Sequence, residues 1–297
     1  MQQKESLSLS ALIRSLFGTG VSIIQKSSVS GGDINEAFLL ELSDGNRIFM
    51  KTNRGKGPSF YEAEAEGLLA IAKTGTIGTP KVLGIGVENT AAFLLLEYVN
   101  SSKRIPDFWE TFGSALAAMH AADTASFVPD GRFGFHMDNI IGATKQINTP
   151  KNTWIDFYRA CRLAPQFEMA STYFDHTEKS RILQLLDHLD DLLIEPETPS
   201  LLHGDLWGGN FMTGENGHAI LIDPAVYVGH PEADLAMTEL FGGFAHDFYE
   251  AYFTKKTLQP GYEDRRDLYH LYQLLNHLNL FGGSYYSSVM RILRHYT

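Results

Sequence analysis

A His-Gly-Asp triplet at 203–205 directly follows the apolar residues Leu201 and Leu202. Asn210 comes five positions after Asp205, and a second apolar run, 220–222, ends in Asp223. Two short strands joined by a turn at 214–217 would bring Asp205, Asn210 and Asp223 to one rim. Gly-Asp and Asp-Pro pairs are ordinary turn sequences, but turns alone do not explain this joint spacing. The pattern therefore predicts a functional site.

The three polar residues fit the needs of phosphoryl transfer. An acid must orient the hydroxyl that accepts the phosphoryl group, and oxygen ligands must hold Mg²⁺ against the phosphates of ATP. We expect Asp205 to face the acceptor hydroxyl. Asn210 and Asp223 are the expected Mg²⁺ ligands, because Mg²⁺ prefers a few hard oxygen ligands and retains waters. His203 is interpreted as a structural hydrogen-bonding residue, since Asp205 takes the acceptor position.

The order of predicted elements divides the chain into a β-rich part and a helical part. Apolar runs predict strands at 21–24, 37–42, 47–50, 81–87 and 91–99, with a hairpin turn at Asp44-Gly45. A helix is predicted from Pro58 to about Lys73, with Gly75 as its stop. After Asn100, periodicity predicts helices near 108–119, 151–167, 178–194, 233–254 and 264–295.

This order predicts an α+β fold with two lobes. The first, residues 1–99, is a small antiparallel β lobe with one helix that binds nucleotide. The second, residues 100–297, is a larger and mainly α-helical lobe that holds the catalytic and acceptor sites. The hinge is expected near 97–101. The two lobes are expected to form a single unit.

A lysine on the third strand is expected to contact the α and β phosphates of the nucleotide, and a glutamate on the inserted helix is expected to pair with this lysine. Lys51 stands at the end of that strand. Glu62, Glu64 and Glu66 are the candidates on the helix, and only Glu64 shares a face with the apolar residues Tyr61 and Leu68. Glu64 is therefore the predicted partner of Lys51, while Glu62 and Glu66 should point to solvent. The alternative is that Lys51 is a solvated charge at a strand end.

Further residues are assigned to the site by position. Gly31, Gly32 and Asp33 link the first two strands, and paired glycines permit a close approach of the backbone to phosphate oxygens. Residues from Glu97 to Val99 follow the fifth strand and would present backbone groups to adenine.

Two more residues have open roles. Asp234 begins a helix and is expected to brace the catalytic loop through backbone N–H groups; the alternative is that it only complements the helix dipole. Trp207 either lines the acceptor site or is a core aromatic residue, and the sequence does not decide between these.

Charge and composition exclude some classes of function. The net charge of −11 argues against broad binding to nucleic acid or to an anionic membrane, since both need a basic surface. Cys161 is the only cysteine, so no intramolecular disulfide is possible, and it is expected in the core. The N-terminus lacks the apolar run of a signal peptide, and no apolar stretch is long enough to span a membrane. We expect a cytoplasmic protein.

The same segments resemble a known family. His-Gly-Asp with Asn210 and Asp223 resembles the aminoglycoside phosphotransferase and choline kinase branch of the protein-kinase-like fold. Within that branch, the chain is most similar to the fructosamine (ketosamine) kinase family. The segments that carry this resemblance are 31–35, 203–210, 223–225, 230–237, 240–244 and 271–283.

The resemblance implies ATP-dependent phosphorylation of the sugar 3-hydroxyl of ketosamines, which are rearranged adducts of sugars with amines. The phosphorylated adduct is unstable, so the activity would serve deglycation. Which sugar is used, and whether the amine is free, in a peptide or in a protein, stays open. In the acceptor pocket, Trp207 would supply a flat surface, and Asp234 or Glu239 would supply negative charge for the amine.

Two other functions remain open. The first is a kinase for another hydroxyl acceptor, such as an aminoglycoside or an amino alcohol. A polycationic aminoglycoside would need a dense acidic run in the helical lobe, but 268–286 contains no acidic residue. The second is a kinase-like binding module without activity, against which the complete set of Lys51, Glu64, Asp205, Asn210 and Asp223 argues.

Overall fold

Five strands near the N-terminus form one antiparallel sheet. The computed structural model describes residues 7–29, 36–129 and 132–297. The strands are β1 (Ile23–Val29), β2 (Glu36–Leu42), β3 (Arg47–Asn53), β4 (Val82–Glu88) and β5 (Ala91–Glu97), in the spatial order β1-β2-β3-β5-β4. The predicted turn at Asp44-Gly45 joins β2 to β3, and Gly45 has a φ of 87°.

The first strand begins later and extends further than its apolar residues predicted. The expected range was 21–24, whereas β1 includes the polar stretch up to Val29. As an edge strand it is held by backbone pairing with β2 rather than by burial of its side chains. Its extent therefore leaves little trace in the hydrophobic pattern.

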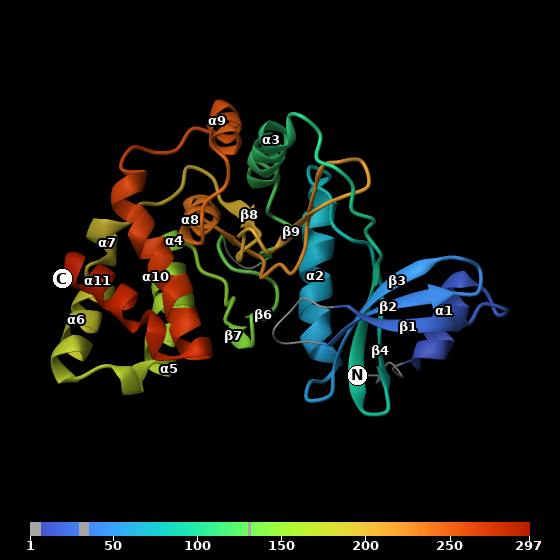
Figure 1. The fold of residues 1–297 in the computed structure, drawn as a ribbon. Helices are drawn as coiled ribbons and strands as arrows, with labels where there is room; N and C mark the ends of the chain where they lie inside the picture. Colours follow the sequence, from blue (N-terminus) through green and yellow to red (C-terminus); the bar gives the residue numbers. More distant parts are fainter. Residues whose placement is uncertain (1–6, 30–35, 130–131) are drawn as a thin grey trace.

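Helices cover both faces of the sheet. The predicted helix is α2 (Pro58–Thr74), which ends at Gly75 in the left-handed conformation, with a φ of 66°. A second helix, α1 (Leu9–Phe17), was not predicted, although Ser8 caps its N-terminus and its buried residues recur at helical spacing. Figure 1 shows α1 behind the sheet, on the side away from the helical lobe.

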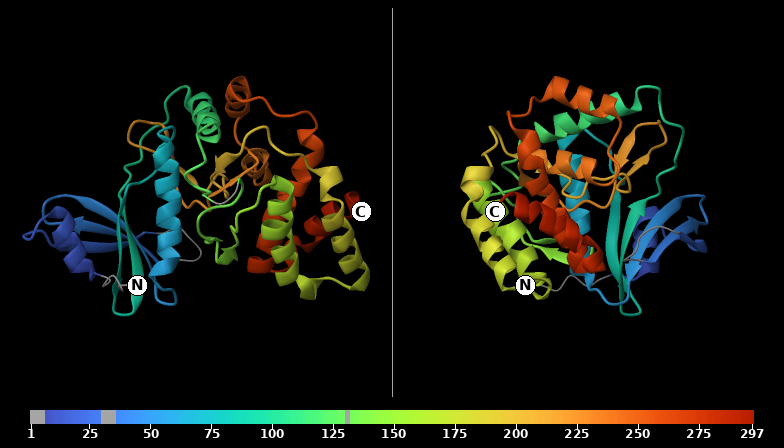
Figure 2. Two further views of the ribbon diagram at one scale, coloured as in Figure 1. Left: turned by 180° about the vertical axis from the view of Figure 1, so that it is seen from behind. Right: turned by 60° about the vertical axis from the view of Figure 1, so that its left-hand side comes forward.

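Helix α2 connects the two parts of the molecule. Tyr61, Ala65 and Leu68 pack against β5 and form one hydrophobic cluster with the sheet. Further along the same helix, Ala70 and Ile71 belong to the core of the helical lobe. Figures 1 and 2 show α2 standing between the sheet and the helices. The position of α2 therefore determines where the lobes face each other.

The larger lobe is mainly helical, as predicted, but glycines interrupt two of the predicted helices. The stretch 233–254 contains α8 (Glu232–Leu240) and α9 (His246–Lys255), separated by Gly242 and Gly243, both with positive φ. The stretch 264–295 contains α10 (Tyr262–Phe281) and α11 (Tyr286–His295), separated at Gly282. The other α-helices are α3 (Phe108–His120), α4 (Trp154–Tyr158), α5 (Ala164–Met169), α6 (His176–Asp187) and α7 (Leu189–Leu192).

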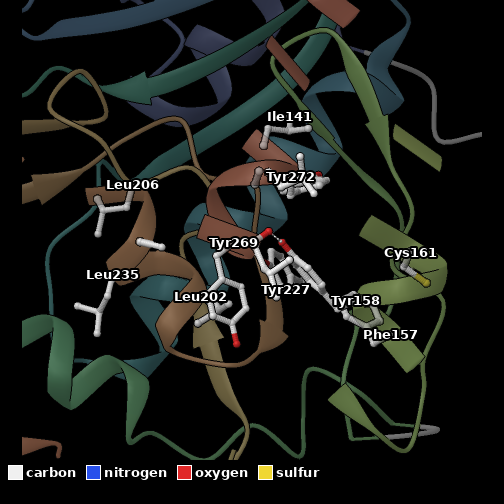
Figure 3. Packing of buried hydrophobic residues seen from close by; sticks show 14 of the residues in the cluster. Ile141, Phe157, Tyr158, Cys161, Leu202, Leu206, Tyr227, Leu235, Tyr269 and Tyr272 are labelled. Carbon is white, nitrogen blue, oxygen red and sulfur yellow. Dashed lines mark hydrogen bonds between the residues drawn. The ribbon is translucent and has the colours of Figure 1, made fainter. Parts of the chain in front are cut away.

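These helices surround a core rich in aromatic side chains. Trp154, Tyr158, Tyr227 and Tyr269 are buried together, and Figure 3 shows three of these rings, those of Tyr158, Tyr227 and Tyr269, close to Tyr272. Cys161 is buried in the same lobe, as predicted. Among the described helices, none is long and apolar enough to cross a membrane.

Three short antiparallel pairs lie between the large helices and the sheet. The predicted hairpin around 214–217 is confirmed as β9 (Phe211–Thr213) and β10 (Ala219–Leu221). The strand before His203 is β8 (Ser200–Leu202), which pairs with β11 (Tyr227–Gly229). The pair β6 (Asn139–Ile141) and β7 (Thr144–Gln146) has only three residues per strand, too few for a recognisable sequence period.

Candidate active site

A cavity of about 610 Å³ lies between the sheet and the helical lobe. The N-terminal part contributes Lys51 from β3 and Glu64 from α2 to its lining. The helical part contributes Asp205, Asn210 and Asp223 from the segments around β9 and β10. All five residues that the sequence grouped together thus line one cavity.

Lys51 contacts two carboxylates. Its Nζ lies 2.7 Å from Glu64 Oε1, which confirms the predicted contact, and it also donates a hydrogen bond to Asp223 Oδ1. Burial alone would lower the pKa of Lys51, but the two carboxylates raise it above its ordinary value. The ammonium therefore stays charged, which a phosphate contact requires.

The other two glutamates of α2 lie outside this pair. Glu62 is exposed, as predicted. Glu66 is only half-exposed, and its Oε2 lies 3.6 Å from His136 Nε2 of the helical lobe. The prediction that Glu66 points to solvent is therefore confirmed only in part, because the helical lobe packs along this side of α2.

The catalytic loop joins Asp205 to Asn210. The Nδ2 of Asn210 donates to the backbone oxygen of Asp205 at 2.7 Å and to its Oδ2 at 2.9 Å. Burial is the largest influence on Asp205, and it raises the pKa of this carboxyl to about 7; the charges of Asp223 and Asp234 act in the same direction, while the hydrogen bond from Asn210 opposes them. Asp205 is therefore poised to hold or release a proton near neutral pH.

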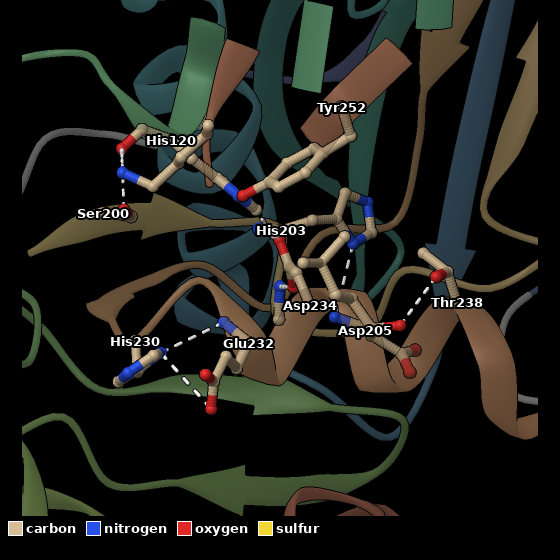
Figure 4. Close-up of polar contacts among 12 residues, drawn as sticks. His120, Ser200, His203, Asp205, His230, Glu232, Asp234, Thr238 and Tyr252 are labelled. Carbon is tan, nitrogen blue, oxygen red and sulfur yellow. Dashed lines mark hydrogen bonds and ion pairs between the residues drawn. The ribbon is translucent and has the colours of Figure 1, made fainter. Parts of the chain in front are cut away.

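Asp234 holds the backbone that precedes Asp205. Its carboxylate accepts hydrogen bonds from the N–H of His203 at 2.7 Å and of Gly204 at 2.8 Å, the bracing contacts predicted for it. It also lies 3.2 Å from His120 Nε2 (Figure 4). Its side chain is almost completely buried, so the expectation that Asp234 supplies charge to an acceptor pocket was wrong.

Glu239 is the other residue that was expected to supply negative charge to the acceptor pocket. Glu239 accepts hydrogen bonds from Tyr262 at 2.7 Å and from Arg266 at 2.9 Å. Its charge is therefore paired with a cation of its own lobe rather than directed at the cavity.

His203 has a structural role, as predicted. Its ring is fully buried, and Nε2 lies 3.0 Å from the backbone oxygen of Ile222, the residue before Asp223. Burial lowers the pKa of His203, so the imidazole stays neutral. His203 thus links the segment of Asp205 to the segment of Asp223.

Two backbone features fix these segments against each other. Gly204 has a φ of 83°, and a Cβ at this position would clash with the backbone oxygen of Ala225, so only glycine fits. Asp223 itself has a φ of 54°, a conformation that non-glycine residues seldom adopt. Such strain is maintained only when the surrounding structure holds the residue in place.

Asn210 and Asp223 fit a magnesium ion by the chemistry of their oxygens. Because Asn210 directs its Nδ2 at Asp205, its planar amide turns Oδ1 to the opposite side, where it accepts no hydrogen bond from a described residue. The Asp223 side chain is 45% exposed towards the cavity. An amide oxygen and a carboxylate facing one cavity are a suitable pair of hard ligands for Mg²⁺.

The expected adenine-binding segment lies at the edge of the cavity. Glu97, Tyr98 and Val99 line it, together with Ser101. The N–H of Glu97 donates to the backbone oxygen of Lys81 at 2.8 Å, so this donor is already used within the sheet. Gly31, Gly32 and Asp33, the expected phosphate loop, lie outside the described residues.

Aromatic and hairpin residues complete the lining. Trp207 is 39% exposed and lines the cavity, so it is not a core residue. Phe281, at the end of α10, also lines it. Ile140 and Gly142 of the β6–β7 hairpin were missed, because a three-residue strand pair has no sequence signature of its own.

Solved structures with the same arrangement of elements include phosphotransferases. A crystal structure from Haemophilus somnus, provisionally named fructosamine-3-kinase, has a TM-score of 0.86 at 30% identity and covers 97% of this chain and 96% of its own. An aminoglycoside phosphotransferase in complex with ADP and hygromycin B shares the fold, with a TM-score of 0.61 at 20% identity over 97% of this chain and 98% of its own. The fold and the two-sided cavity define a protein of the kinase-like class.

Sequence comparison defines the family. The sequence model of the family described as fructosamine kinase matches residues 6–297. A chloroplastic protein-ribulosamine 3-kinase of Oryza sativa is 40% identical over 94% of this chain and 80% of its own length. A probable ketoamine kinase of Synechocystis is 37% identical over 93% of this chain and 92% of its own. The chain belongs to the fructosamine kinase family.

Proposed function

We propose that this protein is an ATP-dependent kinase that phosphorylates the 3-hydroxyl of a ketosamine, either a ribulosamine or a fructosamine. The observation that carries the proposal is the single cavity in which the Lys51–Glu64 pair faces Asp205, Asn210 and Asp223. The names of the relatives direct the choice of acceptor within this class.

In this proposal, one lobe binds the nucleotide and the other binds the acceptor. Residues 1–99 would bind ATP, with Lys51 on the phosphates and the segment from Glu97 to Val99 beside the adenine, and residues 100–297 would bind the acceptor. Gly31, Gly32 and Asp33 are assigned to the phosphates from their sequence alone. A cytoplasmic location would supply both ATP and Mg²⁺.

Asp205 would receive the hydrogen bond of the acceptor hydroxyl and orient its oxygen toward the γ-phosphate. A pKa of about 7 allows this carboxyl to accept the proton as the oxygen forms its new bond. Asn210 restrains the carboxylate through its Nδ2. Most of the catalytic effect in such enzymes comes from positioning and charge stabilisation.

Asn210 and Asp223 would hold Mg²⁺, which when bound neutralises charge that develops on the phosphates. Lys51 already contacts Asp223 and lies where it could exchange that contact for a phosphate oxygen. Glu64 keeps Lys51 in this position during the exchange.

The acceptor side of the cavity suits a short sugar chain. Trp207 and Phe281 offer apolar surface, while Asp234 and Glu239 are engaged elsewhere. Of the described carboxylates that line the cavity, Glu64 and Asp223 are paired with Lys51, and Asp205 and Glu97 are left. This charge is sufficient for one amine but not for a polycation.

The test is to incubate the protein with Mg²⁺-ATP and synthetic ribuloselysine, fructoselysine or kanamycin. ADP release and the mass of the product are then measured. We expect an increase of one phosphate on a ketosamine and none on kanamycin. The Asp205→Asn variant prepared in parallel excludes a contaminating kinase. Phosphorylation of kanamycin without phosphorylation of either ketosamine would overturn the proposal in favour of an aminoglycoside kinase.

A further inference from the structure

The two carbonyl groups after Asp223-Pro224 are held by side-chain amides from a distant hairpin. Gln146 Nε2 of β7 donates to Ala225 O at 2.9 Å, and Asn139 Nδ2 of β6 donates to Val226 O at 2.7 Å. Both amide side chains are almost completely buried, at 2% and 4% exposure. They satisfy two buried carbonyl groups of a loop that lies outside the strands.

A tyrosine hydroxyl determines the orientation of these amides. Tyr272 of α10 donates to Gln146 Oε1 at 2.6 Å, and this leaves Nε2 as the atom that faces Ala225. Gln146 Nε2 also donates to Asn139 Oδ1 at 2.7 Å, which in turn directs Asn139 Nδ2 at Val226. Burial raises the pKa of the Tyr272 hydroxyl above its ordinary value, so it stays a donor.

The opposite side of the same loop is attached to the catalytic strand. The N–H of Ala225 donates to the backbone oxygen of His203 at 2.8 Å. Ala225 is therefore held through both its N–H and its carbonyl oxygen, close to Asp223 and its φ of 54°, and such a conformation is maintained only where the surrounding structure holds it.

The hairpin is also in contact with the cavity and with α2. Ile140 and Gly142 line the cavity beside Asp223. Figures 1 and 2 show β6 and β7 between α2 and the helical lobe, and β6 packs against α2. The hairpin thus lies between the helix that carries Glu64 and the loop that carries Asp223.

We propose that Tyr272, Gln146 and Asn139 are positioning residues that fix the Asp223 loop for Mg²⁺ binding. This inference rests on the proposed function, since it assumes that Asp223 is a metal ligand. Residues that orient a metal ligand commonly change metal affinity by about 10- to 100-fold when they are replaced. The same scale is expected here.

The experiment measures ADP binding by titration calorimetry over a range of Mg²⁺ concentrations and in EDTA. Gln146→Glu removes the donor to Ala225 and should raise the Mg²⁺ concentration needed for half-maximal ADP affinity by at least about tenfold. Tyr272→Phe removes only the orienting hydroxyl and should raise this Mg²⁺ concentration several-fold. ADP affinity in EDTA should stay close to that of the wild type for both variants.

Tyr158→Phe is the matched control. Its hydroxyl is also buried and also donates one hydrogen bond, at 2.8 Å, but to the backbone oxygen of Leu268 in α10. It should lose a similar amount of stability and keep the Mg²⁺ dependence of the wild type. Should Gln146→Glu fail to fold, the pair Tyr272→Phe and Tyr158→Phe decides the question.

Two results would overturn this inference alone. One is an unchanged Mg²⁺ dependence in folded Tyr272→Phe or Gln146→Glu, and the other is an equal shift in Tyr158→Phe and Tyr272→Phe. A wild-type protein that binds ADP equally well with Mg²⁺ and in EDTA would instead contradict the proposed function, and this inference with it.

Discussion

Lys51 Nζ lies 2.7 Å from Glu64 Oε1, which connects strand β3 to helix α2 across the inner face of the sheet. Both side chains are nearly buried, and the ammonium also contacts Asp223 of the other lobe. Because breaking a buried ion pair leaves one charge uncompensated, each partner depends strongly on the other. The pair thus fixes the position of α2 relative to the strand that carries Lys51.

Replacing Glu64 should weaken the use of ATP. Glu64→Gln should lower kcat/KM for ATP by at least about tenfold, because the buried ion pair with Lys51 is replaced by a hydrogen bond to a neutral amide. Glu62→Gln, at an exposed position on another face of α2, should leave kcat/KM for ATP unchanged. Steady-state kinetics at saturating acceptor would measure both. Equal losses in the two variants would contradict the assignment of Glu64.

Substitutions of Asp205 and of Asp223 should affect different properties, turnover in the first case and Mg²⁺-dependent nucleotide binding in the second. Asp205→Asn should lower turnover by at least about 10²-fold, the scale of removing one transition-state contact, while ADP still binds in a Mg²⁺-dependent manner. Asp223→Asn should abolish the Mg²⁺ dependence itself. Calorimetry beside a coupled ADP assay distinguishes the two. Near wild-type turnover in Asp205→Asn would show that Asp205 does not orient the acceptor.

Asp205 should also make stability depend on pH. The pKa of its carboxyl is raised by burial from 3.8 to about 7 in the folded protein, so folding favours the protonated form. The stability that this proton provides is present at low pH and is lost as the pH rises through about 7. Asp205→Asn has no such proton to lose. The Tm of this variant should therefore rise relative to the Tm of the wild type as the pH increases from 5 to 8. Thermal unfolding in EDTA at several pH values tests this, and a constant difference in Tm would refute it.

Asp234 should be a determinant of stability as well as of activity. In Asp234→Asn, one amide group replaces a carboxylate that accepts two backbone N–H bonds and contacts His120. The amide nitrogen cannot accept, so one buried donor loses its partner at a cost of about 1–3 kcal/mol. Urea unfolding should show this loss, and kcat should fall with it. Thr238→Val, which removes a buried hydroxyl of the same helix that contacts the backbone of Leu235, should lower stability without a comparable fall in kcat.

Much of this site was accessible from the sequence, because its key residues lie in short segments with fixed spacing. Asp205, Asn210 and Asp223 flank two short apolar runs, and the hairpin β9–β10 brings them together as their spacing predicted. Glu64 was identified by helical periodicity, since its contact with Lys51 needs the same helix face as Tyr61 and Leu68. Such local patterns determine which residues can meet.

Tertiary structure alone decided the contacts that depend on packing between distant segments. Glu66 meets His136, Glu239 pairs with Arg266, and Asp234 is buried behind the catalytic loop, although each is an ordinary acid in the sequence. The hydrogen bonds from Gln146 and Asn139 to the loop after Asp223 join residues about eighty positions apart in the chain, and no sequence period indicates them. A hydrophobic period reports which face of an element is buried, but the partner of a buried polar group is set by how the elements pack. The sequence therefore determined the chemistry of the site, and packing determined which side chains hold it in place.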